Sequence, residues 1–235
     1  MTLDRVLSRH GLASRTVAAE WIHTGRVRVN STIERNEGRW IDLKRDRIKV
    51  DDRAVSTAKK VYVILNKPAN VVTSHGDPQG RKTVYDYLLG LTAWVSPVGR
   101  LDKDTSGLLL LTNDTDFGNR LTDPQSKIPK KYWAKVNAVL EEEELVRLRK
   151  GIEIEAGLMT RPCIVTWLRK SEKYSWLEIT ITEGKNRQIR RMIEALGRKV
   201  IKLVRLQIGG LRLGELAVGK WRELTSAEVR MLKNK

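Results

Sequence analysis

The sequence predicts an α+β protein: a small N-terminal α/β domain, then a larger domain with a mixed, largely antiparallel sheet flanked by helices. Three observations lead to this fold class. Strand and helix patterns are mixed along the chain without strict alternation. The first part holds patterns for two helices and two strands, and a polar stretch follows it. We therefore expect a domain at 1–51, a linker at 52–60 and a domain at 61–235.

The chain is strongly basic, with 45 Lys+Arg against 28 Asp+Glu and a formal net charge of +17. This charge favours a polyanionic partner, most simply a nucleic acid, although a basic surface without a specific partner has the same composition. Cys163 is the single cysteine and the three histidines lack ligand spacing, so neither a disulfide framework nor a metal site is expected. No secretory signal or membrane span is predicted, and a reducing, cytoplasmic location fits.

The N-terminal domain has the pattern of a small basic module. Apolar residues at helical spacing predict a helix that ends at Gly11 and a second between Ser14 and Gly25. Short strands follow in RVRVN and DRIKVDD. Its exposed positions are rich in arginine: Arg5, Arg9, Arg15, Arg26 and Arg28. These arginines present a basic face to phosphates, or simply form a solvated charged face.

The larger domain opens with VYVILNKP, an apolar run that predicts a buried strand. NVVTS is a candidate second strand, and TVYDYLLG predicts a short helix that ends at Gly90. The run EEEE opens a helix that continues to Gly151, because acids in the first turn and bases in the last complement the helix dipole. We interpret this run as helix chemistry rather than a metal site. IVTWL and WLEITI predict an antiparallel pair, RQIRRMIEALG a helix, and short strands recur to the end.

One carboxylate lies directly before the most apolar run of the chain. WVSPVG and LLLLTN predict strands, so RLDKDTSG between them is a loop braced on both sides. Gly99 and Gly107 permit a left-handed backbone there. A carboxylate in such a loop is better placed for catalysis than one on a free tail. An Asx-turn formed by Asp102 or Asp104 explains the same spacing.

A second candidate is Tyr132 in KKYWAKV. Strand alternation places Tyr132, Ala134 and Val136 on one face, and Trp133 and Lys135 on the other. An inward tyrosine can stack on a base and handle a proton, or can simply pack in the core.

A third candidate is the arginine cluster in TEGKNRQIRRM, where a helix is predicted to begin near Asn186. Arg187 and Arg190 lie three apart, on roughly one face, while Ile189 and Ile193 share another and should be buried. An arginine here can reach a carboxylate across a cleft and keep it ionised, or the cluster holds phosphates only.

Together, and in this order, these motifs resemble the ribosomal RNA pseudouridine synthases of the RsuA/RluB type. GRLDKDTSGLLLLTND, KKYWAKV, EGKNRQIRRM and LVRLQIGGLRLGELAVGKWREL all follow the family pattern, which extends from about Val61 to the C-terminus. The N-terminal stretch LDRVLSRHGLASR…GRVRVN resembles the S-four-type RNA-binding domain.

The resemblance implies the pseudouridine synthase catalytic fold, with an active-site cleft across the middle of the sheet. It also implies the reaction, in which a uridine in RNA loses its glycosidic bond at N1 and its uracil rotates and rejoins through C5. Because this is an isomerisation, no cofactor is expected.

The resemblance also implies roles for particular residues. Asp102 matches the essential aspartate, as nucleophile on the sugar or as the base that starts elimination. Arg190 matches the basic residue that pairs with it, and Tyr132 the tyrosine that stacks on the base and assists removal of the C5 proton. Four further residues are assigned to substrate binding: Arg100, which fills the gap left by the extruded base, Lys67, Arg187 and Ile189.

The expected partner is ribosomal RNA or an assembling ribosomal subunit, and the resemblance implies a monomer. DPQGRKTVYD resembles members that act on large-subunit RNA. The alternative is a non-catalytic RNA-binding assembly factor on the same fold, which the presence of the whole catalytic set disfavours. A DNA-binding protein ranks last, because no recognition helix in a dimeric setting is found.

Overall fold

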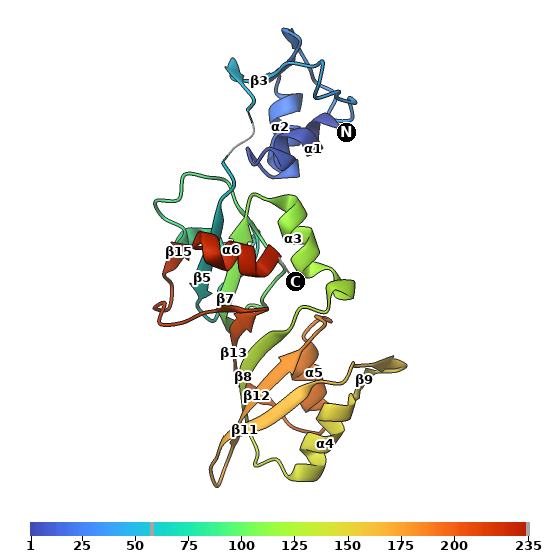
Figure 1. Ribbon diagram of the computed structural model, residues 1–235, viewed down its shortest axis with the longest axis vertical. Coiled ribbons are helices and arrows are strands. Elements are labelled where there is room, and N and C mark those ends of the chain that lie inside the picture. The colour runs from blue at the N-terminus through green and yellow to red at the C-terminus, as the bar shows by residue number, and fades with distance from the viewer. Residues whose placement is uncertain (57–58, 234–235) are drawn as a thin grey trace.

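A computed structural model describes residues 1–56 and 59–233. Figure 1 shows an elongated molecule with the N-terminal domain at one end and a long sheet through the rest. The N-terminal domain consists of two helices packed on a small sheet of order β2-β1-β3-β4. Its elements are α1 (Leu3–Arg9), α2 (Arg15–His23), β1 (Val27–Val29), β2 (Thr32–Ile33), β3 (Ile48–Val50) and β4 (Arg53–Ala54). The two predicted helices are confirmed, and so are the strands in RVRVN and DRIKVDD.

The junction between the two parts is more structured than the polar composition of 52–60 indicates. Arg53–Ala54 pairs with β3 and so belongs to the small sheet, while residues 57 and 58 of this stretch lie outside the described residues. An ion pair of 2.7 Å between Arg9 of α1 and Asp116 joins the two parts of the chain. The division into 1–51, 52–60 and 61–235 stays a prediction.

The large sheet has the strand order β11-β12-β8-β13-β7-β5-β15, with β14 and β6 paired at its sides. Its strands are β5 (Tyr62–Lys67), β6 (Ser96–Pro97), β7 (Thr105–Thr112), β8 (Lys130–Val136), β11 (Ile164–Lys170), β12 (Ser175–Ile181), β13 (Val200–Ile208), β14 (Leu211–Arg212) and β15 (Trp221–Glu223). The pair β13–β7 is parallel, and the other described pairs of this sheet are antiparallel. The predicted mixed, largely antiparallel sheet is therefore confirmed.

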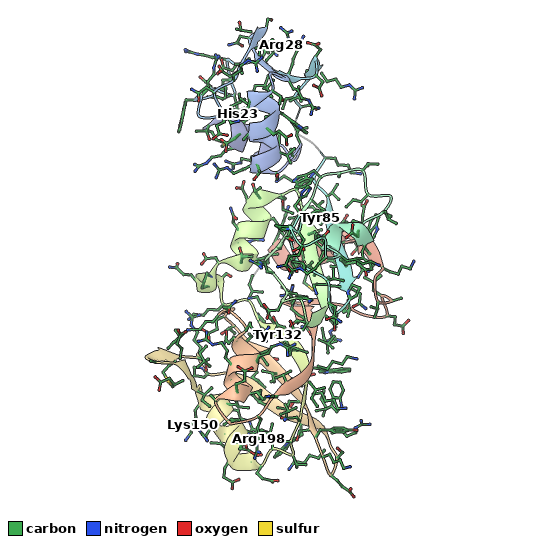
Figure 2. All side chains as sticks on the ribbon, turned by 180° about the vertical axis from the view of Figure 1, so that it is seen from behind. His23, Arg28, Tyr85, Tyr132, Lys150 and Arg198 are labelled. Atoms are coloured by element: carbon green, nitrogen blue, oxygen red, sulfur yellow. The ribbon has the colours of Figure 1, made fainter. Side chains whose placement is uncertain are left out.

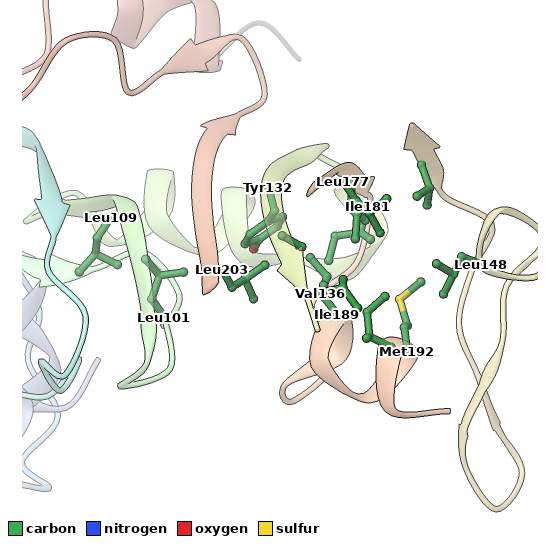
Figure 3. Packing of buried hydrophobic residues seen from close by; sticks show 14 of the residues in the cluster. Leu101, Leu109, Tyr132, Val136, Leu148, Leu177, Ile181, Ile189, Met192 and Leu203 are labelled. Atoms are coloured by element: carbon green, nitrogen blue, oxygen red, sulfur yellow. The ribbon is translucent and has the colours of Figure 1, made fainter. Parts of the chain in front are cut away.

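Helices flank both halves of this sheet. They are α3 (Thr115–Thr122), α4 (Glu142–Lys150), α5 (Gln188–Glu194) and α6 (Ser226–Lys233), with short 3₁₀ turns at Val84–Tyr87 and Pro124–Ser126 and a small hairpin of β9 (Glu153–Glu155) and β10 (Leu158–Met159). In Figure 1, α3 and α6 lie beside β5 and β7, whereas α4 and α5 lie beside β8 and β12. One buried cluster runs from Leu109 and Leu101 past Tyr132 and Leu203 to Met192, and so joins the two halves (Figure 3).

Two predicted elements differ. NVVTS is not a strand, because of its residues only Val72 makes a bridge, to Thr83. TVYDYLLG forms a single 3₁₀ turn at Val84–Tyr87 rather than an α-helix. A capping box between Thr83 and Asp86 closes this turn, and so short a segment cannot repay the cost of nucleating an α-helix.

Candidate active site

A cleft of about 530 Å³ crosses the middle of the large sheet, where β7, β8 and β13 lie side by side. We call it the central cleft. The loop before β7 and the loop before α5 form much of its wall. Five of the predicted site residues line it: Arg100, Asp102, Tyr132, Arg187 and Ile189. Segments far apart in the sequence thus converge on one place, which the pattern of motifs had predicted.

Asp102 lies in a tight loop between the bend at Gly99 and the start of β7. Gly99 has a positive φ of 74°, as expected, and the backbone N–H of Thr105 donates to the carbonyl of Asp102 at 3.0 Å. The strand begins three residues earlier than predicted, at Thr105 rather than Leu108, which shortens the loop. Asp102 is half-buried, and among the described residues its carboxylate forms neither an ion pair nor a hydrogen bond that would define an Asx-turn. It is therefore an unpaired carboxylate that faces the central cleft.

Arg190 does not pair with Asp102, and this expectation is wrong. Arg190 is buried, and its Nη2 donates to the backbone carbonyl of Asp104 at 3.1 Å and lies 3.5 Å from the Asp104 carboxylate. Arg187 reaches the same carboxylate at 3.4 Å. The reason is the turn closed by Thr105, which directs Asp104 toward α5 and leaves Asp102 in the cleft. Arg190 therefore holds the loop that carries Asp102 and does not contact the Asp102 carboxylate itself.

The charge on Asp104 is stabilised by these contacts. Burial by itself would raise the pKa of this carboxyl. Its own backbone N–H and the charges of Arg190 and Arg187 outweigh that effect and hold the pKa of Asp104 below its ordinary value. The Asp104 carboxylate thus stays ionised and connects the loop that carries Asp102 to Arg190 and Arg187.

Lys67 also acts on this loop, which corrects its assignment to substrate. Its side chain is fully buried, and Nζ donates to the carbonyls of Thr105 at 2.8 Å, Pro68 at 3.0 Å and Lys103 at 3.2 Å. All three ammonium protons are therefore in use, and no phosphate can approach. Burial lowers the pKa of Lys67 to about 8, against the opposing effect of Asp104 and Asp102.

Tyr132 occupies the cleft side of β8. The predicted alternation is confirmed, since Tyr132, Ala134 and Val136 are buried whereas Trp133 is exposed. The tyrosine belongs to the main buried cluster and also lines the central cleft. Its ring therefore packs in the core and also closes one wall of the cleft, while its stacking on a base stays a prediction.

Helix α5, which follows one of the two loops of the cleft wall, begins later than predicted. Arg187 has a left-handed backbone with φ of 47°, so α5 starts at Gln188 and Arg187 is not on a helical face with Arg190. Ile189 and Ile193 are buried, as expected. A strained backbone at a non-glycine residue in a cleft wall is typical of a functional loop.

The predicted N-terminal arginines are mostly engaged in surface ion pairs. Arg9, Arg15, Arg26 and Arg28 lie near carboxylates of Asp116, Asp4, Asp51 and Asp52, respectively. Arg5 is exposed and has no ion pair within the described ranges. The pairs of Arg9, Arg26 and Arg28 are exposed, and because such pairs contribute only about 0–1 kcal/mol they do not prevent exchange toward phosphate. Arg15 instead pairs with the buried Asp4. Figure 2 shows Arg28 at the end of the molecule remote from Tyr132.

Sequence reasoning missed two cations that line the central cleft, Lys130 and Arg205. A signal was available for Arg205. In LVRLQI the alternation that puts Leu203 inward also puts Arg205 inward, next to the buried core.

Two kinds of site are not found in residues 1–56 and 59–233. No group of three or more His, Cys, Asp or Glu side chains is arranged to hold a metal ion there. In the same ranges, every helix is too short or too polar to cross a bilayer.

Comparison with known proteins identifies the family of this chain. The fold is similar to the crystal structure of a pseudouridylate synthase, with a TM-score of 0.71 and 30% identity over 99% of each chain. The sequence matches the RNA pseudouridylate synthase family over residues 61–195 and the S4 domain over residues 1–39. It is 42% identical to the ribosomal large subunit pseudouridine synthase B of Bacillus subtilis, over 98% of this chain and 95% of the relative. It is 40% identical to an uncharacterized RNA pseudouridine synthase of Aquifex aeolicus, over 98% and 92%.

The fold and the cleft thus define an RNA-modifying enzyme with an appended S4 domain. The chain belongs to the RNA pseudouridylate synthase family. It is an RNA pseudouridine synthase, an isomerase that converts uridine to pseudouridine, and the resemblance of its motifs to this family is confirmed.

Proposed function

We propose that this enzyme converts one or a few uridines of large-subunit ribosomal RNA to pseudouridine, with Asp102 as the catalytic carboxylate. The observation that carries the proposal is the unpaired carboxylate of Asp102, held in the central cleft by a braced loop. Relatives named as large-subunit synthases support the target, at 42% identity for the Bacillus subtilis protein and 39% for a synthase E of Vibrio parahaemolyticus.

The residues of the cleft have distinct roles in this proposal. Asp102 attacks C1′ of the ribose or takes a sugar proton to start elimination. Tyr132 stacks on the uracil and assists loss of the C5 proton. Arg100, exposed at the edge of the cleft, fills the gap that the extruded base leaves in the RNA. Arg187 and Ile189, which line the same cleft, contact the substrate.

Lys67 and Arg190 are positioning residues. Both hold the backbone of the loop that carries Asp102, at residues 103 to 105, and both are buried. Such a rigid support keeps a reacting group within the small error that catalysis tolerates.

The S4 domain supplies auxiliary RNA contacts through Arg5, Arg9, Arg15, Arg26 and Arg28. The positive charge of these arginines is opposite to that of the RNA phosphates, and the whole chain carries a net charge of +17. We further propose that the enzyme acts as a monomer in the cytoplasm, on ribosomal RNA or on an assembling subunit.

The test maps pseudouridine in ribosomal RNA from cells with and without the gene, by carbodiimide labelling and primer extension. We expect one or a few large-subunit sites to disappear, to return with wild type and with Glu143→Gln, and to stay absent with Asp102→Asn. Glu143 is the matched control because it is an exposed carboxylate on α4, remote from the cleft. Return of the sites with Asp102→Asn would refute the catalytic role. Loss of no site in the deleted strain would favour a non-catalytic RNA-binding factor.

A further inference from the structure

Arg205 is a buried guanidinium without a carboxylate partner in the wall of the central cleft. Only 3% of its surface is exposed. Its Nε donates to the carbonyl of Leu108 at 2.8 Å, and its Nη2 is buried without a hydrogen-bond partner. Among the described residues, no carboxylate forms an ion pair with it. A buried charge left this way is costly, so its retention requires an explanation.

Arg205 lies at a close contact between two strands in the middle of the large sheet. Arg205 on β13 lies beside Gly107 on β7, and a Cβ at Gly107 would lie 2.2 Å from the Arg205 carbonyl oxygen. The strands can approach this closely because residue 107 has no side chain. The guanidinium is therefore held on a rigid strand rather than on a loop.

Arg205 faces the place where a target base would stack. It lies directly opposite Tyr132 in the register of β13 and β8, and both line the cleft. Side chains at such opposed positions start about 5 Å apart on the same face of a sheet. Lys130 lines the same wall, and its pKa is lowered by burial and by the charge of Arg205. A base on Tyr132 would thus present its edge to two partly dehydrated cations.

The chemistry of the reaction requires a positive group at that edge. When the C1′–N1 bond breaks, its electron pair stays on uracil, which becomes an anion with charge shared by N1, O2 and O4. After the uracil rotates, C5 forms the C5–C1′ bond as C1′ releases the Asp102 carboxylate, or as C2′ regains its proton in the elimination route. C5 then gives its proton to a base and N1 takes one up, so that the product is an isomer of the substrate. Between cleavage and rejoining the anion must be stabilised without being protonated, which guanidinium can do because it does not lose its proton.

We propose that Arg205, with Lys130 beside it, donates hydrogen bonds to a carbonyl oxygen of the target uracil, O2 or O4, and stabilises the uracil anion formed on glycosidic cleavage. A phosphate fits Arg205 less well than the base does, because Arg205 is buried whereas the RNA phosphates follow the sugar backbone along the cleft surface. The exposed Arg100 and Arg187 lie at that surface and are better placed to contact phosphates. The proposal rests on the proposed function of this cleft.

The experiment compares the single-turnover rate of glycosidic cleavage in two RNAs, with uridine or with 5-fluorouridine at the mapped site, at saturating enzyme. The rate is followed as loss of the starting nucleoside in nuclease digests, because 5-fluorouridine has no C5 proton to release. Fluorine stabilises the uracil anion by itself, so the substituted base needs less help from the protein. For Arg205→Gln we expect about a 100-fold loss of rate on uridine, the usual loss for one donor to a developing anion, and a loss at least threefold smaller on 5-fluorouridine. The Kd for RNA should stay within about twofold. Arg212→Gln, an exposed arginine on β14 paired with β13, should match wild type on both RNAs.

Each other outcome overturns the inference. Equal losses on both RNAs would indicate a structural role, and a weaker Kd with an unchanged rate would indicate a phosphate contact. If Arg205→Gln fails to unfold cooperatively like wild type, Arg205→Lys provides the same comparison with the positive charge retained. Its loss must again be smaller on 5-fluorouridine. A wild-type enzyme that converts neither RNA would instead refute the proposed function.

Discussion

Gly107→Ala is the substitution whose cost the structure specifies most directly. Residue 107 has φ of 99°, where an L-residue is strained by about 1–2 kcal/mol. The new Cβ would also lie 2.2 Å from the carbonyl oxygen of Arg205, so β7 and β13 must separate by about 1 Å to restore ordinary contact. Forcing such overpacking costs about 1–3 kcal/mol more. We therefore expect the free energy of unfolding to fall by about 2–5 kcal/mol.

The measurement is urea denaturation, and Gly214→Ala provides the matched control. Gly214 also has a positive φ, of 61°, but a Cβ there meets no atom within 4 Å. The control should therefore lose only the backbone strain, about 1 kcal/mol. The difference between the two variants isolates the contact between the strands. Because this contact positions Arg205 and the start of β7, we also expect Gly107→Ala to reduce kcat while Gly214→Ala does not.

Equal losses of stability in the two variants would refute this reasoning. They would mean that separating β7 from β13 costs no free energy, and that only the positive φ at residue 107 requires a glycine there. A folded Gly107→Ala enzyme with wild-type kcat would contradict the claim that this strand contact positions the cleft.

Two further predictions concern the support of the Asp102 loop. The pKa of Lys67 is about 8 in the folded chain, against 10.5 for an ordinary lysine. Between these two values the unfolded state binds more protons than the folded state. The contribution of Lys67 to the free energy of unfolding therefore rises with pH across pH 8–10.5. Relative to Lys67→Met, wild type should therefore gain up to about 3 kcal/mol in urea denaturation over this window, and a constant difference would show that Lys67 does not titrate there. Asp104→Asn should lower kcat by about 10- to 100-fold with little change in KM, because it removes the ion-pair partner of Arg190 and loosens the loop. The measurement is a steady-state tritium-release assay. An unchanged kcat would contradict a role for this ion pair in positioning the loop.

The sequence by itself determined the family, the fold class and the local elements. Alternation in KKYWAKV placed Tyr132 inward, and the charge order of EEEELVRLRK located α4, because both patterns depend on neighbours within one turn or one strand. The motif order also predicted that Asp102 and Tyr132 line the same cleft. Short segments such as NVVTS were ambiguous, since a few residues of apolar pattern do not specify a partner strand.

Only the tertiary structure decided which charges meet. Arg190 pairs with Asp104 rather than Asp102 because one backbone turn rotates the loop, and Lys67 is buried because three carbonyls of that loop converge on it. Arg205 opposes Tyr132 because of a strand register between segments more than 70 residues apart. Local periodicity reports which face a side chain occupies. The partner across that face depends on long-range register and loop geometry, which close packing of the whole chain sets.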